Sequence, residues 1–263
     1  MKRFVLAMLS LLLAPALSHA QLGGLRINSN TIKGLGSAVN AATLSNEQVV
    51  AYARQGVKWM DEKNPVAPAN SPYATRLEKI VNDHQEIDGL KINYKVYLVK
   101  DINAFACADG SVRVFAGLMN IMDDDELLAI MGHEIGHVVN HDTRDAMKSA
   151  LNRSALRTVA ASQSGGVGQI ARSELGGFAN AMIDASYSRK QESEADEFSY
   201  QFLKKNNYNV LALATSFEKL AKLSEESGQM KTATDKLMAS HPDSAKRAKR
   251  VRDQARKDGL LKE

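Results

Sequence analysis

The segment from His133 to His137 carries the residue types whose spacing best suits chemistry. Two imidazoles stand four positions apart, and a carboxylate directly follows the first. Four residues of α-helix turn the chain by about 400°, so both imidazoles face the same side and can bind one metal ion. Glu134 can then take the proton of a metal-bound water as that water attacks a carbonyl. Zinc suits this arrangement, because its catalytic sites use three N or O ligands and keep a fourth position open.

The same short motif can arise by chance on a structural helix. Two features of the surrounding sequence argue against chance. Gly136 leaves room for substrate or backbone to approach the helix surface closely. Ionisable side chains in an otherwise apolar helix also need partners. The apolar residues of this helix are Leu127, Leu128, Ile130, Met131, Ile135, Val138 and Val139.

A third metal ligand has to come from another part of the chain. His141 stands only four residues after His137, so the spacing of metzincins is not met. Glu192 is the next candidate, 192 − 137 = 55 residues after His137, and Asp196 shares its helical face. One carboxylate can bind the metal while the other orients a histidine. On its own such an acidic face would more often be solvated, and the histidine motif reverses that interpretation.

The first twenty residues differ from the rest of the chain. Two basic residues precede an apolar run from Phe4 to Leu17, and small residues stand at Ser18 and Ala20. This pattern predicts a secretory signal peptide over residues 1–20 that is cleaved after Ala20. A membrane anchor is the alternative, but the run of about 14 residues is shorter than the ~20 that a spanning helix needs.

The composition is that of an ordinary globular protein, with 44% hydrophobic and 24% charged residues. Cys107 is the only cysteine, so no intramolecular disulfide can form. Loss of Lys2 and Arg3 with the signal peptide lowers the formal charge from +4 to +2, which does not favour a nucleic-acid partner. Basic residues near the C-terminus are expected on a solvated helix face, with contact to an anionic membrane surface as the alternative. They are Lys246, Arg247, Lys249, Arg250, Arg252, Arg256 and Lys257.

Helices dominate the expected elements, because unbranched residues are plentiful and aromatic residues make up only 6%. We expect helices at about 45–60, 72–86, 126–150, 189–205, 210–224 and 244–257. Alternating apolar residues predict a strand within 91–100, and a turn at Asp109-Gly110 predicts antiparallel strands at 104–106 and 112–115. These strands should form the only sheet. The expected fold is α+β and mainly helical.

Two segments lack the periodicity of a regular element. Residues 21–44 are rich in Gly, Asn, Ser and Thr and are expected to form a flexible arm. Residues 154–186 are rich in Ala, Gly and Ser, and the pairs Gly165-Gly166 and Gly176-Gly177 should break helical runs there. The remaining chain, 45–263, is expected to be one metallopeptidase domain.

Several segments together resemble a known family. They are Asn103-Ala104-Phe105, Gly117-Leu118-Met119, His133 to His137, Ser188-Arg189 with Glu192 to Asp196, His241-Pro242 with Arg247, and Leu213 to Leu223. They look like the HtpX, LoiP and BepA family of gluzincin zinc endopeptidases from about Ser45 onward, and most like its LoiP-like periplasmic members. The resemblance implies a zincin-like metallopeptidase domain in which a small, partly antiparallel sheet packs beside the motif helix.

The resemblance also implies roles for individual residues. One Zn²⁺ per chain would be held by His133, His137 and Glu192, with Glu134 as the general base. Asp196 would then be the carboxylate that orients a histidine. The strand at Asn103, Ala104 and Phe105 would be an edge that pairs with extended substrate, which demands little of the substrate sequence.

His241 raises a separate hypothesis. BepA-like relatives are thought to place this histidine on the metal as a fourth, inhibitory ligand. The alternative is that His241-Pro242 only breaks the chain before the last helix. Tyr187, Arg189 and Arg247 are all candidates for lining the site and stabilising the oxyanion.

The resulting hypothesis is a periplasmic zinc endopeptidase that hydrolyses unfolded or misassembled envelope proteins in quality control. Association with the outer membrane is left open. LoiP-like proteins usually carry a cysteine for lipid attachment, and none stands near the predicted cleavage site. The competing hypothesis is a periplasmic chaperone or scaffold whose zinc site is structural or inhibited.

Overall fold

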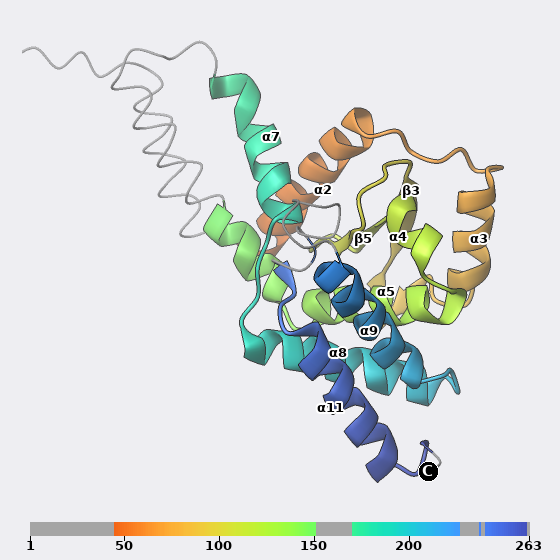
Figure 1. Ribbon diagram of the computed structural model, residues 1–263. Helices are drawn as coiled ribbons and strands as arrows, with labels where there is room; N and C mark the ends of the chain where they lie inside the picture. Colours follow the sequence, from red (N-terminus) through yellow and green to blue (C-terminus); the bar gives the residue numbers. More distant parts are fainter. Residues whose placement is uncertain (1–44, 151–169, 227–236, 238–239, 262–263) are drawn as a thin grey trace, which may run out of the picture.

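The computed structural model describes residues 45–150, 170–226, 237 and 240–261 (Figure 1). The predicted signal peptide, the predicted arm at 21–44 and residues 151–169 lie outside this range. One domain over 45–263 stays a prediction. Within the described residues, no helix is both long and apolar enough to cross a membrane.

The fold is mainly helical, as predicted, and its strands are short. The helices are α2 (Asn46–Lys63), α3 (Pro72–Val81), α4 (Ala116–Ile121), α5 (Asp124–Val139), α7 (Ile170–Ile183), α8 (Arg189–Lys205), α9 (Leu211–Glu226) and α11 (Ser244–Lys257). The strands are β1 (Glu86–Ile87), β2 (Leu90–Lys91), β3 (Asn93–Tyr97), β4 (Ala104–Ala106) and β5 (Ser111–Phe115).

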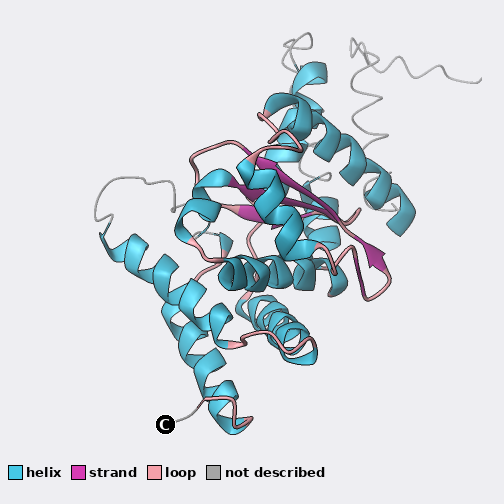
Figure 2. Ribbon diagram, turned by 90° about the vertical axis from the view of Figure 1, so that its right-hand side faces the viewer, coloured by secondary structure: helices cyan, strands magenta, loops and turns pink. Residues whose placement is uncertain are grey.

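The main sheet has three strands in the order β3-β5-β4. β5 runs parallel to β3 and antiparallel to β4, with Ala104 opposite Val114, which confirms the predicted antiparallel pair. Side chains alternate between the two faces of the sheet. Ala104 and Val114 belong to a core cluster that includes α5, whereas Phe105 and Tyr97 pack in a second cluster with α2. Helices accordingly lie on both sides of the strands (Figure 2).

A second sheet, made of β1 and β2, corrects the prediction of a single sheet. Asp88 and Gly89 have φ values of 49° and 76°, which form the tight two-residue turn that joins antiparallel strands. This hairpin also explains why α3 ends at Val81 rather than at the predicted Glu86.

Helix α5 begins at a capping box formed by Asp123 and Glu126, but it does not continue to residue 150 as predicted. It ends at Val139, and the backbone turns at His141, whose φ is 68°. Residues 142–150 are helical again. The break lets Asp142 come back beside the motif histidines.

Helices α5 and α8 pack closely because glycine replaces side chains at their contact. A Cβ atom on Gly136 would lie 3.1 Å from both Cα and the carbonyl oxygen of Ala195. The expected close approach to Gly136 is therefore made by the α8 backbone. One turn further along α8, Ser199 Oγ donates a hydrogen bond of 2.7 Å to the carbonyl of Ala129. These contacts bring the acidic face of α8 against the histidines of α5.

Helix α7 corrects the expectation that Gly176-Gly177 breaks a helix, because both glycines lie inside it. A Cβ atom on Gly176 would lie 3.1 Å from the Trp59 ring of α2. The glycine thus permits close packing between two helices and does not terminate one.

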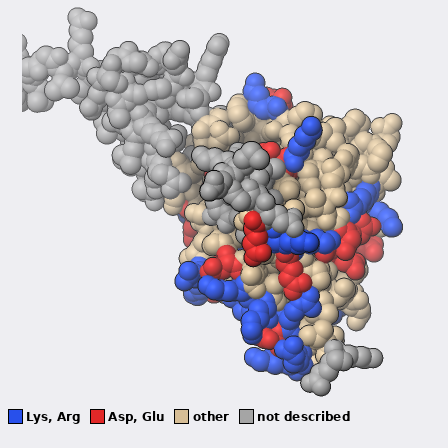
Figure 3. Space-filling model, viewed as in Figure 1, with Lys and Arg blue, Asp and Glu red and all other residues tan. Residues whose placement is uncertain are grey.

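Helix α11 carries the basic residues near the C-terminus, and it corrects part of their interpretation. Arg247 is 4% exposed and so does not belong to a solvated face. Others pair with acidic residues: Arg252 with Glu218 at 2.6 Å and Lys249 with Asp253 at 2.6 Å. Figure 3 shows acidic side chains among the basic ones in this region of the surface. The helix presents mixed charge rather than a purely basic strip.

Candidate metal centre

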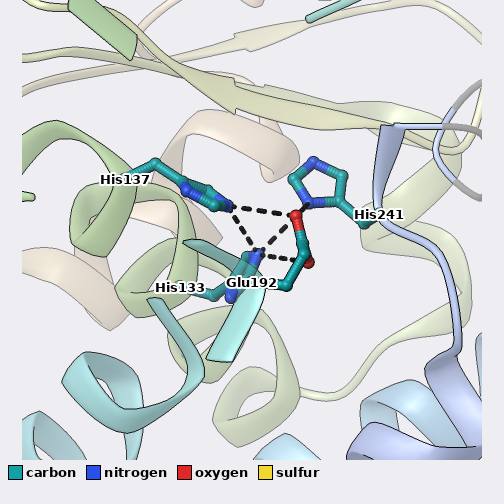
Figure 4. A group of neighbouring side chains, drawn as sticks. All are labelled: His133, His137, Glu192 and His241. Carbon is teal, nitrogen blue, oxygen red and sulfur yellow. Dashed lines mark hydrogen bonds and ion pairs between the residues drawn. The ribbon is translucent and has the colours of Figure 1, made fainter. Parts of the chain in front are cut away.

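Four buried side chains converge at one point between α5, α8 and the segment before α11 (Figure 4). His133 and His137 come from α5, Glu192 from α8, and His241 from the chain that leads into α11. Each offers one ligand atom, and these atoms all lie within 4.8 Å of one another. The structure thus brings together every residue that was predicted as a metal ligand, including the candidate fourth one.

The ligand atoms face each other directly. The Nε2 atoms of His133 and His137 are 3.2 Å apart. Glu192 Oε1 lies 3.4 Å from His137 Nε2, and Oε2 lies 3.6 Å from His133 Nε2. His241 Nδ1 is 3.0 Å from Glu192 Oε1 and 3.2 Å from His133 Nε2. His241 therefore lies against both Glu192 and His133, in a position to act as a fourth ligand.

Each motif histidine is held at its other ring nitrogen by a carboxylate. His133 Nδ1 lies 3.0 Å from Asp196 Oδ1, and His137 Nδ1 lies 2.9 Å from Asp142 Oδ2. Such partners fix the tautomer and leave Nε2 to bind a metal. Two oriented imidazoles, a carboxylate and a third imidazole form a donor set that fits zinc.

Asp142 was not singled out from the sequence, because its role depends on the break in the helix. The sequence signal is weak: Asn and His tolerate the left-handed conformation better than most residues, and Asn140-His141 precede Asp142. Gln191 Nε2 donates a 2.8 Å hydrogen bond to Asp142 Oδ1. Gln191 Oε1 in turn accepts from the backbone of Ser188, which caps α8. Asp142 thereby links His137 to the start of the helix that carries Glu192.

Arg247 neutralises the two carboxylates of α8. Its Nη1 lies 2.6 Å from Glu192 Oε2, and its Nη2 lies 2.6 Å from Asp196 Oδ1. The guanidinium also sits 4.0 Å from the centre of the Phe217 ring. The donors of Arg247 are therefore directed at the carboxylates that surround the histidines.

The other two candidates for oxyanion stabilisation lie in different surroundings. Arg189 has a side chain 84% exposed and pairs with Asp243 at 3.1 Å, so it points out of the site. The Tyr187 ring stacks on His137, with 3.8 Å between ring centres and 16° between planes. Tyr187 therefore contacts the site, whereas Arg189 does not.

Burial and neighbouring charges shift the two motif histidines in opposite directions. Burial lowers the pKa of His133 to about 3, and the charge of Arg247 acts in the same direction. Burial also lowers the pKa of His137, but hydrogen bonds with Asp142 and Glu192 outweigh it and raise that pKa to about 9. In the absence of metal, the neighbouring carboxylates Asp142 and Glu192 thus favour the protonated form of His137, whereas a metal ion binds the neutral ring.

Glu134 is 3% exposed, and its Oε1 lies 3.5 Å from His241 Nε2. Burial raises the pKa of this carboxyl, although the nearby His241 and His137 oppose the effect. A carboxylate with a raised pKa is a better proton acceptor near neutral pH.

Strand β4 forms an edge of the main sheet. Phe115 donates its backbone N–H to Asn103 over 3.0 Å, and Cys107 donates to Ser111 over 2.8 Å. Because antiparallel pairing alternates, the backbone groups of Ala104 and Ala106 point away from β5. These two alanines are only 1% and 7% exposed, so the edge is covered.

Comparison with known proteins agrees with this geometry. A family profile described as peptidase family M48 matches residues 72–255. Metalloprotease LoiP of Escherichia coli K12 is 42% identical over 253 residues, which cover 95% of this chain and 98% of LoiP. Metalloprotease YcaL of the same organism is 42% identical over 249 residues, covering 92% and 96%. A beta-barrel assembly-enhancing protease of Yersinia pestis is 26% identical over 248 residues, covering 88% of this chain and 49% of that protein.

Proposed function

This chain belongs to peptidase family M48 and is a metalloprotease, and from that premise we propose that it is a zinc-dependent endopeptidase of the periplasm. The observation that carries the proposal is the convergence of His133, His137 and Glu192 on one buried point. When bound, zinc would polarise the carbonyl of the substrate and lower the pKa of the attacking water. His133, His137 and Glu192 would hold one ion per chain, and Glu134 would accept the proton of the attacking water.

The remaining residues of the site position these four. Asp196 and Asp142 fix the rings of His133 and His137, so each Nε2 faces the same point. Arg247 keeps two neighbouring carboxylates buried without repulsion between them.

Substrate would be held by its backbone along the edge of β4. Asn103, Ala104 and Phe105 are the residues predicted for this contact, and of these Ala104 is the one whose backbone groups face away from β5. Backbone pairing accepts many sequences, provided that the substrate is extended. This requirement favours unfolded or misassembled polypeptides over folded ones. The covered edge means that the cleft has to open before a peptide can pair with it.

Envelope proteins are the proposed substrates, and quality control is the proposed role. The name of the Yersinia pestis relative concerns β-barrel assembly, which is an outer-membrane process. The predicted signal peptide over residues 1–20 supports export to the compartment where such substrates occur. The low net charge offers no support for a nucleic-acid partner.

Cleavage of casein by the purified chain without residues 1–20 tests the proposal. We expect cleavage that stops with a zinc chelator and returns when zinc is added back. Cleavage that persists after all metal has been removed would contradict a zinc peptidase.

A periplasmic chaperone or scaffold with a structural or inhibited zinc site is the second candidate. The contacts of His241 with Glu192 and His133 favour it, because a metal with four protein ligands has no open position. Changing His241→Ala separates the two functions. A gated peptidase gains activity in this variant, whereas a structural site loses metal affinity without gaining turnover. Lys249→Ala, which alters a side chain that is 77% exposed and lies outside the cluster, is the control.

A further inference from the structure

A hollow of about 320 Å³ lies at the C-terminal end of α5, the helix that carries His133 and His137. Val138 and Val139, which directly follow His137, form one side. The other lining residues include Val50 of α2, Leu90 of β2, Ala108 and Arg144. Ala108 comes directly after Cys107, whose backbone N–H makes the last hydrogen bond between this end of β4 and β5. The hollow is therefore lined by residues that directly follow the proposed ligand His137 in α5 and the edge strand β4 with Cys107.

The hollow is accessible, unlike the metal centre. The four converging residues of the metal centre are at most 8% exposed. By contrast, the rim residues Asn46, Asp88 and His141 are exposed, and Val50 and Leu90 are half-buried. A polypeptide can reach the hollow while the metal centre is still closed.

The lining suits a large apolar side chain attached to a peptide backbone. Val50, Leu90, Val138 and Val139 give an aliphatic floor, and burial of apolar area there contributes about 25 cal/mol per Å². Arg144 also lines the hollow, and its Nε pairs with the exposed Asp145 at 3.1 Å. Its Nη1 reaches Asn46 Oδ1 at 3.4 Å, a long contact that it can exchange for a peptide carbonyl.

We propose that this hollow is a docking site for substrate polypeptide on the N-terminal side of the scissile bond. The inference rests on the proposed function. Antiparallel pairing is the commoner arrangement of neighbouring strands. A peptide antiparallel to β4 has its N-terminal part at the Ala108 end, because β4 runs from Ala104 towards Ala108. The residue before the scissile bond is taken to pair with Ala104 or Ala106. The residue that lies opposite Ala108, beside the hollow, then stands roughly two to four residues before the bond.

Two peptides from one mapped casein cleavage site test the proposal. The long peptide includes the upstream residues with a leucine in the predicted interval, and the short one lacks them. Binding is measured by fluorescence anisotropy on the zinc-loaded Glu134→Gln chain, which allows binding without turnover. We expect Leu90→Asp to weaken binding of the long peptide about tenfold and to leave the short peptide unaffected.

Leu98→Asp is the matched control, because Leu98 is 39% exposed and lies outside the hollow. Leu90→Ala keeps the test valid if the charged variant misfolds. It should weaken binding of the long peptide by a smaller factor. Equal binding of the long peptide to parent and both Leu90 variants would overturn the proposal. A concentration-dependent dimer that Leu90→Asp dissociates would also overturn it, because a second copy would then fill the hollow. If the wild-type chain cleaves casein at no bond, the proposed function fails, and binding of two casein peptides with and without an upstream leucine still decides whether the hollow takes polypeptide.

Discussion

The Nδ1 atom of His137 lies 2.9 Å from Oδ2 of Asp142, a residue only five positions further along the chain. A continuous helix would carry Asp142 away from that ring nitrogen. The left-handed turn at His141 instead returns Asp142 to the site. The contact connects a break in the motif helix to the orientation of a proposed metal ligand.

Asp142→Asn should weaken zinc binding about 10- to 100-fold, because the amide no longer supports the correct ring nitrogen with a negative charge. Competition against a chromogenic chelator measures this affinity directly. The matched control is Asp145→Asn, which alters an exposed carboxylate three residues away. Unchanged affinity in Asp142→Asn would show that the carboxylate has no role in orienting His137.

Arg247→Ala should lower the free energy of unfolding of the metal-free protein by about 3–5 kcal/mol. The variant leaves Glu192 and Asp196 buried, each about 3% exposed, without the guanidinium that lies 2.6 Å from both. Urea denaturation followed by circular dichroism measures the change.

Arg252→Ala on the same helix provides the comparison. Arg252 pairs with Glu218 on the surface, and its loss should cost less than about 1 kcal/mol. Similar losses for the two variants would mean that the buried ion pairs of Arg247 are not important for stability.

Gly176 and Gly177 are adjacent in α7 but differ in what surrounds them. A Cβ on Gly177 meets nothing within 4 Å, so Gly177→Ala should stabilise the helix by about 0.5–1 kcal/mol. Gly176→Ala places a methyl group 3.1 Å from Trp59, and this crowding should offset the gain or exceed it by about 1–3 kcal/mol. Trp59 is the only tryptophan, so its fluorescence should change for Gly176→Ala alone. Equal stabilisation by both variants would contradict the close packing of α7 on α2.

The sequence predicted those elements whose signals are local. Helices α8 and α11 have the predicted bounds, and a capping box at Ser188 marks the start of α8. The pairing of β4 with β5 followed from a turn signal between them. Helical spacing pointed to His133 and His137, whereas Glu192 and Asp196 followed from spacing together with the family resemblance.

Features that depend on contacts between distant elements could not be predicted in the same way. The apolar periodicity of the motif helix gives no sign of its end at Val139. Arg247 lies in a strongly basic segment, and its burial depends on two carboxylates supplied by α8. The glycine pair at Gly176 predicts a helix break from sequence alone. The helix continues, and Gly176 instead makes room for the Trp59 ring of α2. In each case tertiary packing outweighs the local preference.

The central claim is that His133, His137 and Glu192 hold a catalytic zinc ion and that Glu134 is the base. Metal content and casein cleavage, measured on the same preparation of Glu134→Gln, test it most directly. The account predicts one zinc per chain, as in the parent, with cleavage at least about 100-fold slower. Cleavage at the parental rate with zinc in place would contradict it.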